Sequence, residues 1–310
     1  MRRFRLDLVA LVAVVALLPF LLPNGYWFDV TIRVGLAAIA AVGLNILMGF
    51  AGQLSIGHAG LVAAAAYVSA LLNARAGVPA WLSMLAATGL VTAVSFALSR
   101  PMLRLRGFGL AIATLGLGLI IQIVLVNEVD WTGGPDGMTV NPLQVGEFTF
   151  GAEWDWYALV AATLVFAVAA SLNLYRGPAG RALRALKGSE VAAQVAGVDT
   201  AAMKVRAFTA AGFFAGLSGA LTAHYSGFIT PDLSAFTRSV EFATMVVVGG
   251  RGSTYGVVLG ACLLTVLPQL LGGTGDYEMI AFGLILTVTM VFLPQGLVPT
   301  LAGLRRIRTP

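Results

Sequence analysis

Long apolar stretches separated by short polar segments run along nearly the whole chain. Crossing the roughly 30 Å of hydrocarbon in a bilayer takes about 20 helical residues. The candidate spans are residues 7–23, 30–49, 54–72, 80–99, 108–127, 156–174, 206–226, 239–250, 254–271 and 277–295. Residues 239–250 are too few to cross a bilayer alone, so the pattern predicts roughly eight to ten transmembrane helices. The expected fold is an all-α polytopic membrane protein whose residues 1–310 form a single transmembrane domain.

Composition supports this prediction. The chain is 58% hydrophobic and only 11% charged, whereas soluble domains contain about 25% charged residues. The 37 glycines suit helices that pack backbone to backbone in a membrane. The single cysteine, Cys262, excludes an intrachain disulfide.

Basic residues lie in short clusters between the apolar stretches, which excludes the continuous basic face of a nucleic-acid-binding protein. Ten spans with a cytoplasmic N-terminus place the clusters at 100–106, 176–206 and 305–308 on the cytoplasmic side, as the positive-inside rule requires. Residues 128–155 then form an external loop, which carries six acidic residues and no Lys or Arg. The N-terminal arginines and residues 1–23 resemble a signal peptide, but no small-x-small cleavage site follows, so we predict a first span.

Two Gly-rich segments, 49–60 and 249–256, interrupt apolar stretches. Irregular backbone at membrane depth is tolerated where it is buried in protein or lines a wet cavity, and paired breaks indicate a transport pathway. The glycines expected to break the helices are Gly49, Gly52, Gly57, Gly249, Gly250 and Gly252.

Few polar groups lie within the predicted spans. A passage for a zwitterionic substrate with an apolar tail needs only a few polar contacts. The candidates for lining it are Asn45, Gln53, Ser55, His58 and Glu241. The alternative is that they cap broken helices and join spans by hydrogen bonds. His58 has no ionisable partner nearby in the sequence, so structural hydrogen bonding is favoured over a proton relay.

Residues 176–206 are expected to form a cytoplasmic loop with a short amphipathic helix. Arg181, Arg184 and Lys187 recur at three-residue spacing and therefore lie near one face. Such a helix docks on a partner protein or lies on anionic lipid, and the pattern alone leaves both open.

Catalytic patterns are absent from the sequence. It contains no G-x-x-x-x-G-K-[ST] phosphate loop, no H-E-x-x-H pair and no cysteine–histidine metal spacing. Ser55 and His58 lie three residues apart without an orienting acid. We therefore predict that the chain is not an enzyme and that it binds neither metal nor cofactor.

Residues 190–197, EVAAQVAG, resemble the EAA-type coupling loop of ABC importer permeases. The resemblance then extends along nearly the whole chain to the LivM-type permeases of branched-chain amino-acid ABC importers. It is carried by 43–59 (GLNILMGFAGQLSIGHA), 103–107 (LRLRG), 111–115 (AIATL), 132–137 (TGGPDG), 180–185 (GRALRA), 231–232 (PD), 239–241 (SVE), 245–253 (MVVVGGRGS), 260–261 (GA) and 295–298 (QGLV). The chain departs from the family at Gly256-Val257, where Gly-Pro is common.

The resemblance implies a permease that forms half of a pore together with a LivH-type permease. It further implies two ATP-binding subunits, a periplasmic or lipid-tethered substrate-binding protein, and a location in the cell inner membrane with both termini cytoplasmic. By resemblance, the residues that couple to the ATPase are Gly180, Arg181, Arg184, Glu190, Ala192, Ala193 and Gly197.

Three alternatives remain open from the sequence. The first is a permease for urea, short amides or sugar in the same superfamily. Urea permeases usually lack the form of residues 52–58 found here; sugar permeases share the Gly-rich break, and against them the resemblance of residues 132–137 favours amino acids. A stand-alone secondary transporter needs no ATPase and ordinarily shows intramembrane charge pairs, to which only Glu241 points. An intramembrane enzyme needs a catalytic constellation that the sequence lacks.

Overall fold

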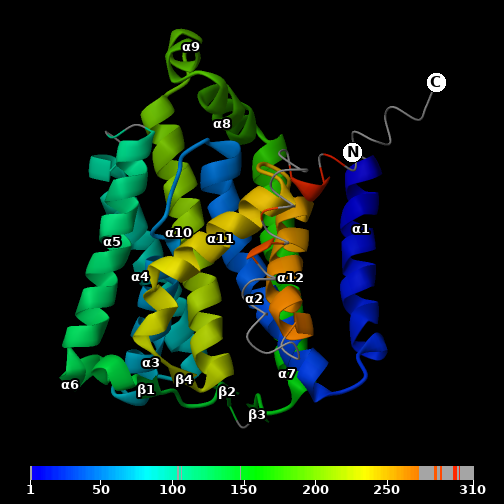
Figure 1. Cartoon of the computed structure of the whole chain (residues 1–310), viewed down its shortest axis with the longest axis vertical. Coiled ribbons are helices and arrows are strands. Elements are labelled where there is room, and N and C mark those ends of the chain that lie inside the picture. Colours follow the sequence, from blue (N-terminus) through cyan, green and yellow to red (C-terminus); the bar gives the residue numbers. More distant parts are fainter. Residues whose placement is uncertain are drawn as a thin grey trace.

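A computed structural model describes residues 2–102, 105, 107–146, 148–271, 283–284, 287, 296–298 and 300. Long helices run side by side between two ends of the molecule, as Figure 1 shows. The helices are α1 (Arg2–Leu17), α2 (Gly25–Asn45), α3 (His58–Ala74), α4 (Ala80–Met102), α5 (Phe108–Asn127), α6 (Val129–Thr132), α7 (Glu153–Arg176), α8 (Pro178–Gly188), α9 (Glu190–Val195), α10 (Thr200–Ser226), α11 (Phe236–Gly249) and α12 (Thr254–Leu271). The prediction of an all-α polytopic membrane protein is confirmed.

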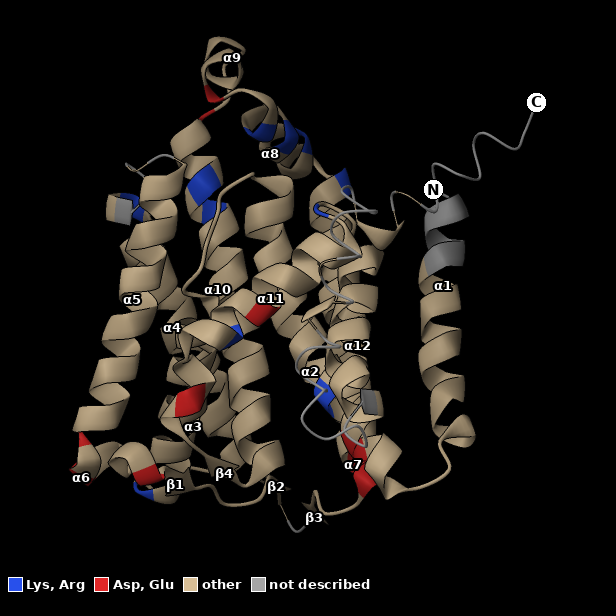
Figure 2. Ribbon diagram, in the orientation of Figure 1, with Lys and Arg blue, Asp and Glu red and all other residues tan. Residues whose placement is uncertain are grey.

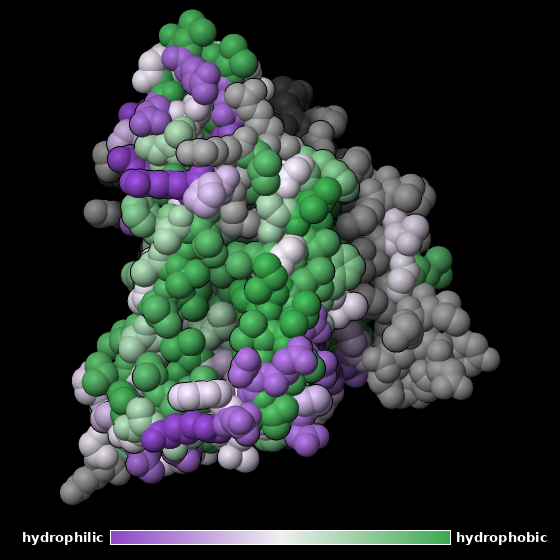
Figure 3. All heavy atoms as spheres, turned by 90° about the vertical axis from the view of Figure 1, so that its left-hand side faces the viewer, coloured by the Kyte–Doolittle hydropathy of each residue, from purple (hydrophilic) through white to green (hydrophobic). Residues whose placement is uncertain are grey.

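Four of the described helical segments are long and apolar enough to cross a bilayer: Gly25–Phe50, Ala80–Pro101, Phe108–Asn127 and Glu153–Arg176. Shorter apolar helices cover Leu8–Leu21, His58–Ala74 and Thr254–Leu270. The tenth predicted span, 277–295, falls almost wholly outside the described residues. The surface carries a broad hydrophobic band between two hydrophilic ends (Figure 3), as a protein with lipid around its middle requires.

The two ends of the molecule differ in what they carry. Helices α8 and α9 project at one end, where α1 also begins, and α6 with the short strands lies at the other (Figure 1). Lys and Arg gather near α8, whereas Asp and Glu are mainly at the opposite end (Figure 2). The strands are β1 (Met138–Thr139), β2 (Gln144–Val145), β3 (Phe148–Thr149) and β4 (Phe228–Ile229). They pair antiparallel as β1–β4 and β2–β3.

Helix α10 lies at the centre, packed against α2, α3 and α4. A stripe of small residues makes this packing close. A Cβ at Gly212 would collide with Ser95 on α4, one at Gly216 would lie 3.1 Å from the Thr88 Cα, and one at Gly219 would collide with the Val62 carbonyl on α3. Small residues that let backbones approach are the usual means of helix association in lipid.

Several boundaries differ from the predicted spans. Helix α10 begins six residues before the predicted start at 206, because Asp199 caps it by accepting a hydrogen bond from the Ala202 amide at 2.9 Å. The span predicted at 30–49 is α2, continued by a π-helical turn, η2 (Ile46–Phe50). The span predicted at 54–72 becomes helical only at His58, since residues 51–57 have no regular secondary structure.

Candidate translocation site

The two Gly-rich breaks lie against each other, although about 200 residues separate them in the chain. Asn45, at the end of α2, is fully buried. Its Oδ1 accepts a hydrogen bond from the Gly252 amide at 2.9 Å. A Cβ at Gly49 would collide with that oxygen and would lie 2.6 Å from the Gly252 nitrogen. The contact therefore requires glycine at position 49.

Other glycines complete this contact. A Cβ at Gly249 would collide with the Gly256 carbonyl at the start of α12, and one at Gly296 would collide with the Gly250 backbone. Positive φ angles of +113° at Gly250 and +91° at Gly252 turn the chain between α11 and α12, a conformation that side chains disfavour. We call Gly49, Gly52, Gly249, Gly250, Gly252 and Gly296 the glycine junction.

Residues 51–57 form an irregular segment between η2 and α3. Backbone bonds hold it: the Gln53 amide donates to the Leu47 carbonyl at 3.0 Å, and the Ile56 amide donates to Thr114 Oγ1 at 3.1 Å. Gly57 lies so close to the Thr114 carbonyl of α5 that a Cβ would collide with it. Ala51, Ser55 and Gly57 of this irregular backbone are buried, whereas Gly52 and Leu54 are exposed. Irregular backbone at membrane depth is tolerated where it is buried in protein or lines a wet cavity.

The polar residues at this break are mostly buried and held by backbone groups. His58 is 1% exposed, and its Nε2 donates to the Ala40 carbonyl of α2 at 3.0 Å. Ser55 is 3% exposed. Gln53 is partly exposed, and its side-chain amide donates to the Ala51 carbonyl at 3.3 Å. Ser239 of α11 accepts a bond from the Ala59 amide at 3.1 Å, so α11 helps to cap α3 in the middle of the molecule.

Glu241 lies apart from these groups on the exposed side of α11. Its carboxylate pairs with Arg238 one turn earlier at 2.9 Å, and both side chains are about half exposed. The i, i+3 spacing of the two residues in the sequence was the signal for this pair. Glu241 is therefore held by a local partner.

The predicted coupling residues form a compact unit at one end of the molecule. Gly180 is buried against the Tyr175 carbonyl, where a Cβ would collide. Arg184 Nη1 donates to that carbonyl at 2.6 Å, and its guanidinium lies 4.4 Å from the Tyr175 ring centre. Arg181 is exposed. These contacts fix α8 to the end of α7.

Helix α9 is tied down at both ends. Glu190 pairs with Lys204 of α10 at 2.7 Å, and Ser189 caps the helix by accepting a bond from the Ala192 amide at 3.2 Å. After α9, Gly197 takes a φ of +81°, and the following Val198 amide donates to the Ala193 carbonyl at 2.9 Å. This is a glycine-terminated helix end.

The outward face of α9 is apolar, although it projects from a hydrophilic end of the molecule (Figure 1). Val191 is 64% exposed and Val195 is 86% exposed, and Ala192 is exposed between them, whereas Ala193 is buried. Exposed apolar side chains grouped on a polar surface mark interaction sites.

Comparisons with known proteins give the family of this chain. Residues 26–294 match the family described as branched-chain amino acid transport system / permease component. The chain belongs to this permease family. It is 36% identical to the high-affinity branched-chain amino acid transport system permease protein LivM of Salmonella typhimurium, covering 95% of this chain and 75% of that protein. It is 28% identical to the ribose import permease protein RbsC of Escherichia coli K12, covering 92% of each chain. No solved structure matches it.

Two lysines of this permease were missed as site residues by the sequence analysis. Lys204 is 2% exposed and is the partner of Glu190. Lys187, at the end of α8, donates from Nζ to the Gly49 carbonyl at 2.8 Å. Burial lowers the pKa of Lys187, and the charge of Arg251 lowers it further. The sequence grouped Lys187 with Arg181 and Arg184 on one face and contained no signal that its ammonium turns inward.

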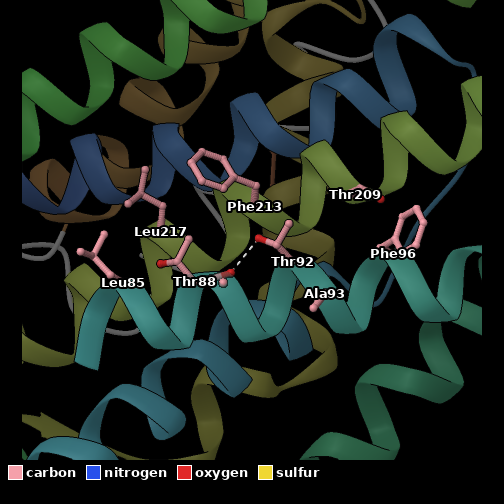
Figure 4. A pocket seen from close by; sticks show the side chains of 9 residues that line it. Leu85, Thr88, Thr92, Ala93, Phe96, Thr209, Phe213 and Leu217 are labelled. Atoms are coloured by element: carbon pink, nitrogen blue, oxygen red, sulfur yellow. Dashed lines mark hydrogen bonds between the residues drawn. The ribbon is translucent and has the colours of Figure 1, made fainter. Parts of the chain in front are cut away.

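A groove of about 520 Å³ on the permease lies between α4 and α10, lined by Leu85, Thr88, Gly89, Thr92, Ala93, Phe96, Thr209, Phe213 and Leu217 (Figure 4). The three threonine hydroxyls donate to carbonyls of their own helices at 2.6–2.8 Å. They therefore have no proton left to donate to a ligand. The groove shares no residue with either Gly-rich break, and its lining suits hydrocarbon rather than a zwitterionic substrate. Within the described ranges, no group of three His, Cys, Asp or Glu residues is placed to hold a metal ion.

Proposed function

We propose that this permease forms half of the transmembrane pathway of an ATP-driven importer for branched-chain amino acids or related hydrophobic amino acids. The observation that carries the proposal is the contact of the two Gly-rich breaks beside a helix pair whose apolar tip is exposed. Family membership supports the substrate class, since the related LivM protein is named for branched-chain amino acid transport. Hydrolysis of ATP is assigned to partner subunits.

The partners follow from the same reasoning. A second, LivH-type permease supplies the other half of the pathway, and two ATP-binding subunits dock on the α8–α9 end. Val191 and Val195 fill an apolar cleft of an ATP-binding subunit, which explains why they are exposed. A periplasmic or lipid-tethered binding protein delivers substrate to the opposite end, formed by residues 128–155. This places residues 176–206 and both termini in the cytoplasm and the chain in the cell inner membrane.

Transport proceeds by alternating access. Closure of the ATP-binding subunits moves α8 and α9, and the helices that flank the glycine junction open the pathway to the other side. Asn45, Gln53, Ser55 and His58 lie in or near the irregular segment 51–57, where they supply the sparse polar contacts that a zwitterion needs. Glu241 lies on the exposed face of α11 and completes the path where the two permeases meet.

A sugar permease is the second candidate, because the match to the ribose import permease covers 92% of the chain. The greater identity to LivM, 36% against 28%, favours amino acids.

Reconstitution separates these functions. The chain is co-expressed with its candidate partner subunits, purified, and placed in proteoliposomes with the matching binding protein, and uptake of leucine and ribose is measured with and without ATP. We expect leucine uptake that needs both ATP and the partners. ATP-dependent ribose uptake would favour the sugar permease. Uptake by the chain alone would overturn the ABC importer in favour of a secondary transporter.

Two substitutions in the coupling unit test the mechanism in the same system. Glu190→Gln removes the charge that pairs with Lys204, and Gly197→Val strains a backbone with a φ of +81°. Both variants are expected to insert normally and to hydrolyse ATP without matching uptake. Normal coupled uptake in both would count against the coupling assignment.

A further inference from the structure

Lys187 connects the coupling helix to the glycine junction. It is the last basic residue of α8, and its ammonium donates to the Gly49 carbonyl at 2.8 Å. The stem of the same side chain packs on Gly52, where a Cβ would lie 3.1 Å from Lys187 Cγ. A Cβ at Gly252 would lie 3.9 Å from the Lys187 nitrogen. One side chain thus bonds to the first break and lies close to the second.

The Gly49 carbonyl is a favourable acceptor for a cation. It belongs to the last turn of the helical run that ends at Phe50, where carbonyls lack amide partners within the helix and the helix dipole is negative. Asn45 lies one turn earlier and bonds to Gly252. Two hydrogen bonds therefore meet in these last turns. Lys187 donates to the Gly49 carbonyl of η2, and the Gly252 amide of the second break donates to Asn45 Oδ1.

The other basic residues of α8 cannot make this connection. Arg184 is engaged with Tyr175 on α7, and Arg181 is exposed. A single extended residue, Ser189, joins α8 to α9, which Glu190 and Lys204 attach to α10. A displacement of α8 and α9 as a unit therefore acts on the glycine junction through Lys187.

We propose that Lys187 is a positioning residue that transmits movement of α8 and α9 to the glycine junction. The inference rests on the proposed function. When α8 moves, the ammonium pulls on or releases the Gly49 carbonyl, and Gly52, with a φ of +69°, serves as the hinge at which segment 51–57 shifts. The buried Asn45 Nδ2 has no acceptor among the described residues. A second arrangement of the glycine junction would supply an acceptor for this amide. An element that transmits movement needs two such discrete arrangements.

The test compares Lys187→Met, which keeps the stem but removes the ammonium, with Lys187→Arg, which keeps a cationic donor. Both are made in the full importer with its partners, in a Cys262→Ser background that leaves no other cysteine. The first measurement is leucine uptake per ATP hydrolysed. The second is thiol labelling of Leu54→Cys, in segment 51–57, where Leu54 is 39% exposed, with and without ATP and vanadate.

We expect the parent protein to change its labelling rate at position 54 when ATP and vanadate are added. In Lys187→Met this change should vanish, and uptake per ATP should fall by about tenfold, because the variant lacks the charge-assisted hydrogen bond through which α8 acts on Gly49. Lys187→Arg should retain both.

A purely structural role for Lys187 predicts a different result. Lys187→Met would then melt at a lower temperature in detergent, yet its labelling would still respond to ATP and its uptake per ATP would be normal. That outcome would overturn the inference and leave the proposed function standing. Failure of ATP-dependent uptake in the parent importer would instead overturn the proposed function.

Discussion

Single glycines and single polar side chains decide how the breaks of this permease are built. Gly49 is the clearest case, because the oxygen of Asn45 and the amide of Gly252 meet in the space that a side chain would fill. Gly116 on α5 is the opposite case, since a Cβ there would meet nothing within 4 Å. The glycines of this sequence are therefore of two kinds: some leave no room for a side chain, and others have open space around them.

We predict that Gly49→Ala lowers the free energy of unfolding by about 1–3 kcal/mol, as overpacking in a tight core usually does, and abolishes uptake. Thermal unfolding in detergent and uptake in proteoliposomes measure the two effects. Gly116→Ala is the matched control and should leave both unchanged. An active Gly49→Ala variant would show that the two breaks need not touch.

His224 is a second residue whose contacts define its role. It is 3% exposed, and its Nδ1 donates to the Asn141 carbonyl at 3.0 Å while its Nε2 accepts from Ser69 at 2.9 Å. It thereby ties α10 to α3 and to residues 128–155. We predict that His224→Leu lowers the free energy of unfolding by about 1–3 kcal/mol, because Ser69 and the Asn141 carbonyl lose their hydrogen-bond partner. A lower melting temperature would be the measurement. An unchanged melting temperature would indicate that the neighbouring groups find other partners.

At the scale of elements, short helices that end inside the molecule replace uninterrupted spans. Helix α11 has 14 residues, which corresponds to about 21 Å and is too short to cross the hydrocarbon alone. It ends at the glycine junction, and its Ser239 caps α3. Breaks paired in this way satisfy each other's backbone groups, so the irregular segments survive at membrane depth.

The exposed apolar face of helix α9 leads to a prediction about the docking of the ATP-binding subunits. We expect the double substitution of Val191 and Val195 to Asp to weaken binding of the ATP-binding subunits by more than about tenfold, because burying one Val stabilises by roughly 1.5–3 kcal/mol. Co-purification from membranes measures binding. Val145→Asp, at a residue 48% exposed on β2 at the other end, is the control and should bind normally. Equal recovery of the partners with both variants would remove α9 from the docking surface.

The whole molecule has two ends of different charge around a hydrophobic band (Figures 2 and 3). Single cysteines at Val195 and Val145 in the Cys262→Ser background test how these ends lie in the cell. In membranes prepared without the ATP-binding subunits, which would cover position 195, an impermeant thiol reagent should label position 195 only in inside-out vesicles and position 145 only in intact spheroplasts. The reverse pattern would invert the proposed orientation.

Much of this architecture was predictable from the sequence. The length and apolarity of the stretches set the membrane class and the approximate spans, because crossing hydrocarbon leaves the backbone few alternatives. Glycine clusters located both breaks, and the spacing of Arg181, Arg184 and Lys187 indicated the amphipathic helix. These signals are local, so one sequence suffices to detect them.

Tertiary structure alone decided which groups meet. The Asn45–Gly252 bond, the Lys187–Gly49 bond and the Glu190–Lys204 pair join residues from separate elements. Periodicity assigns a residue to a helix face but not to a partner, and a long lysine side chain reaches inward or outward from the same position. The sequence by itself determined a membrane permease with two breaks and a coupling helix; packing determined that the breaks touch each other and that Lys187 reaches them.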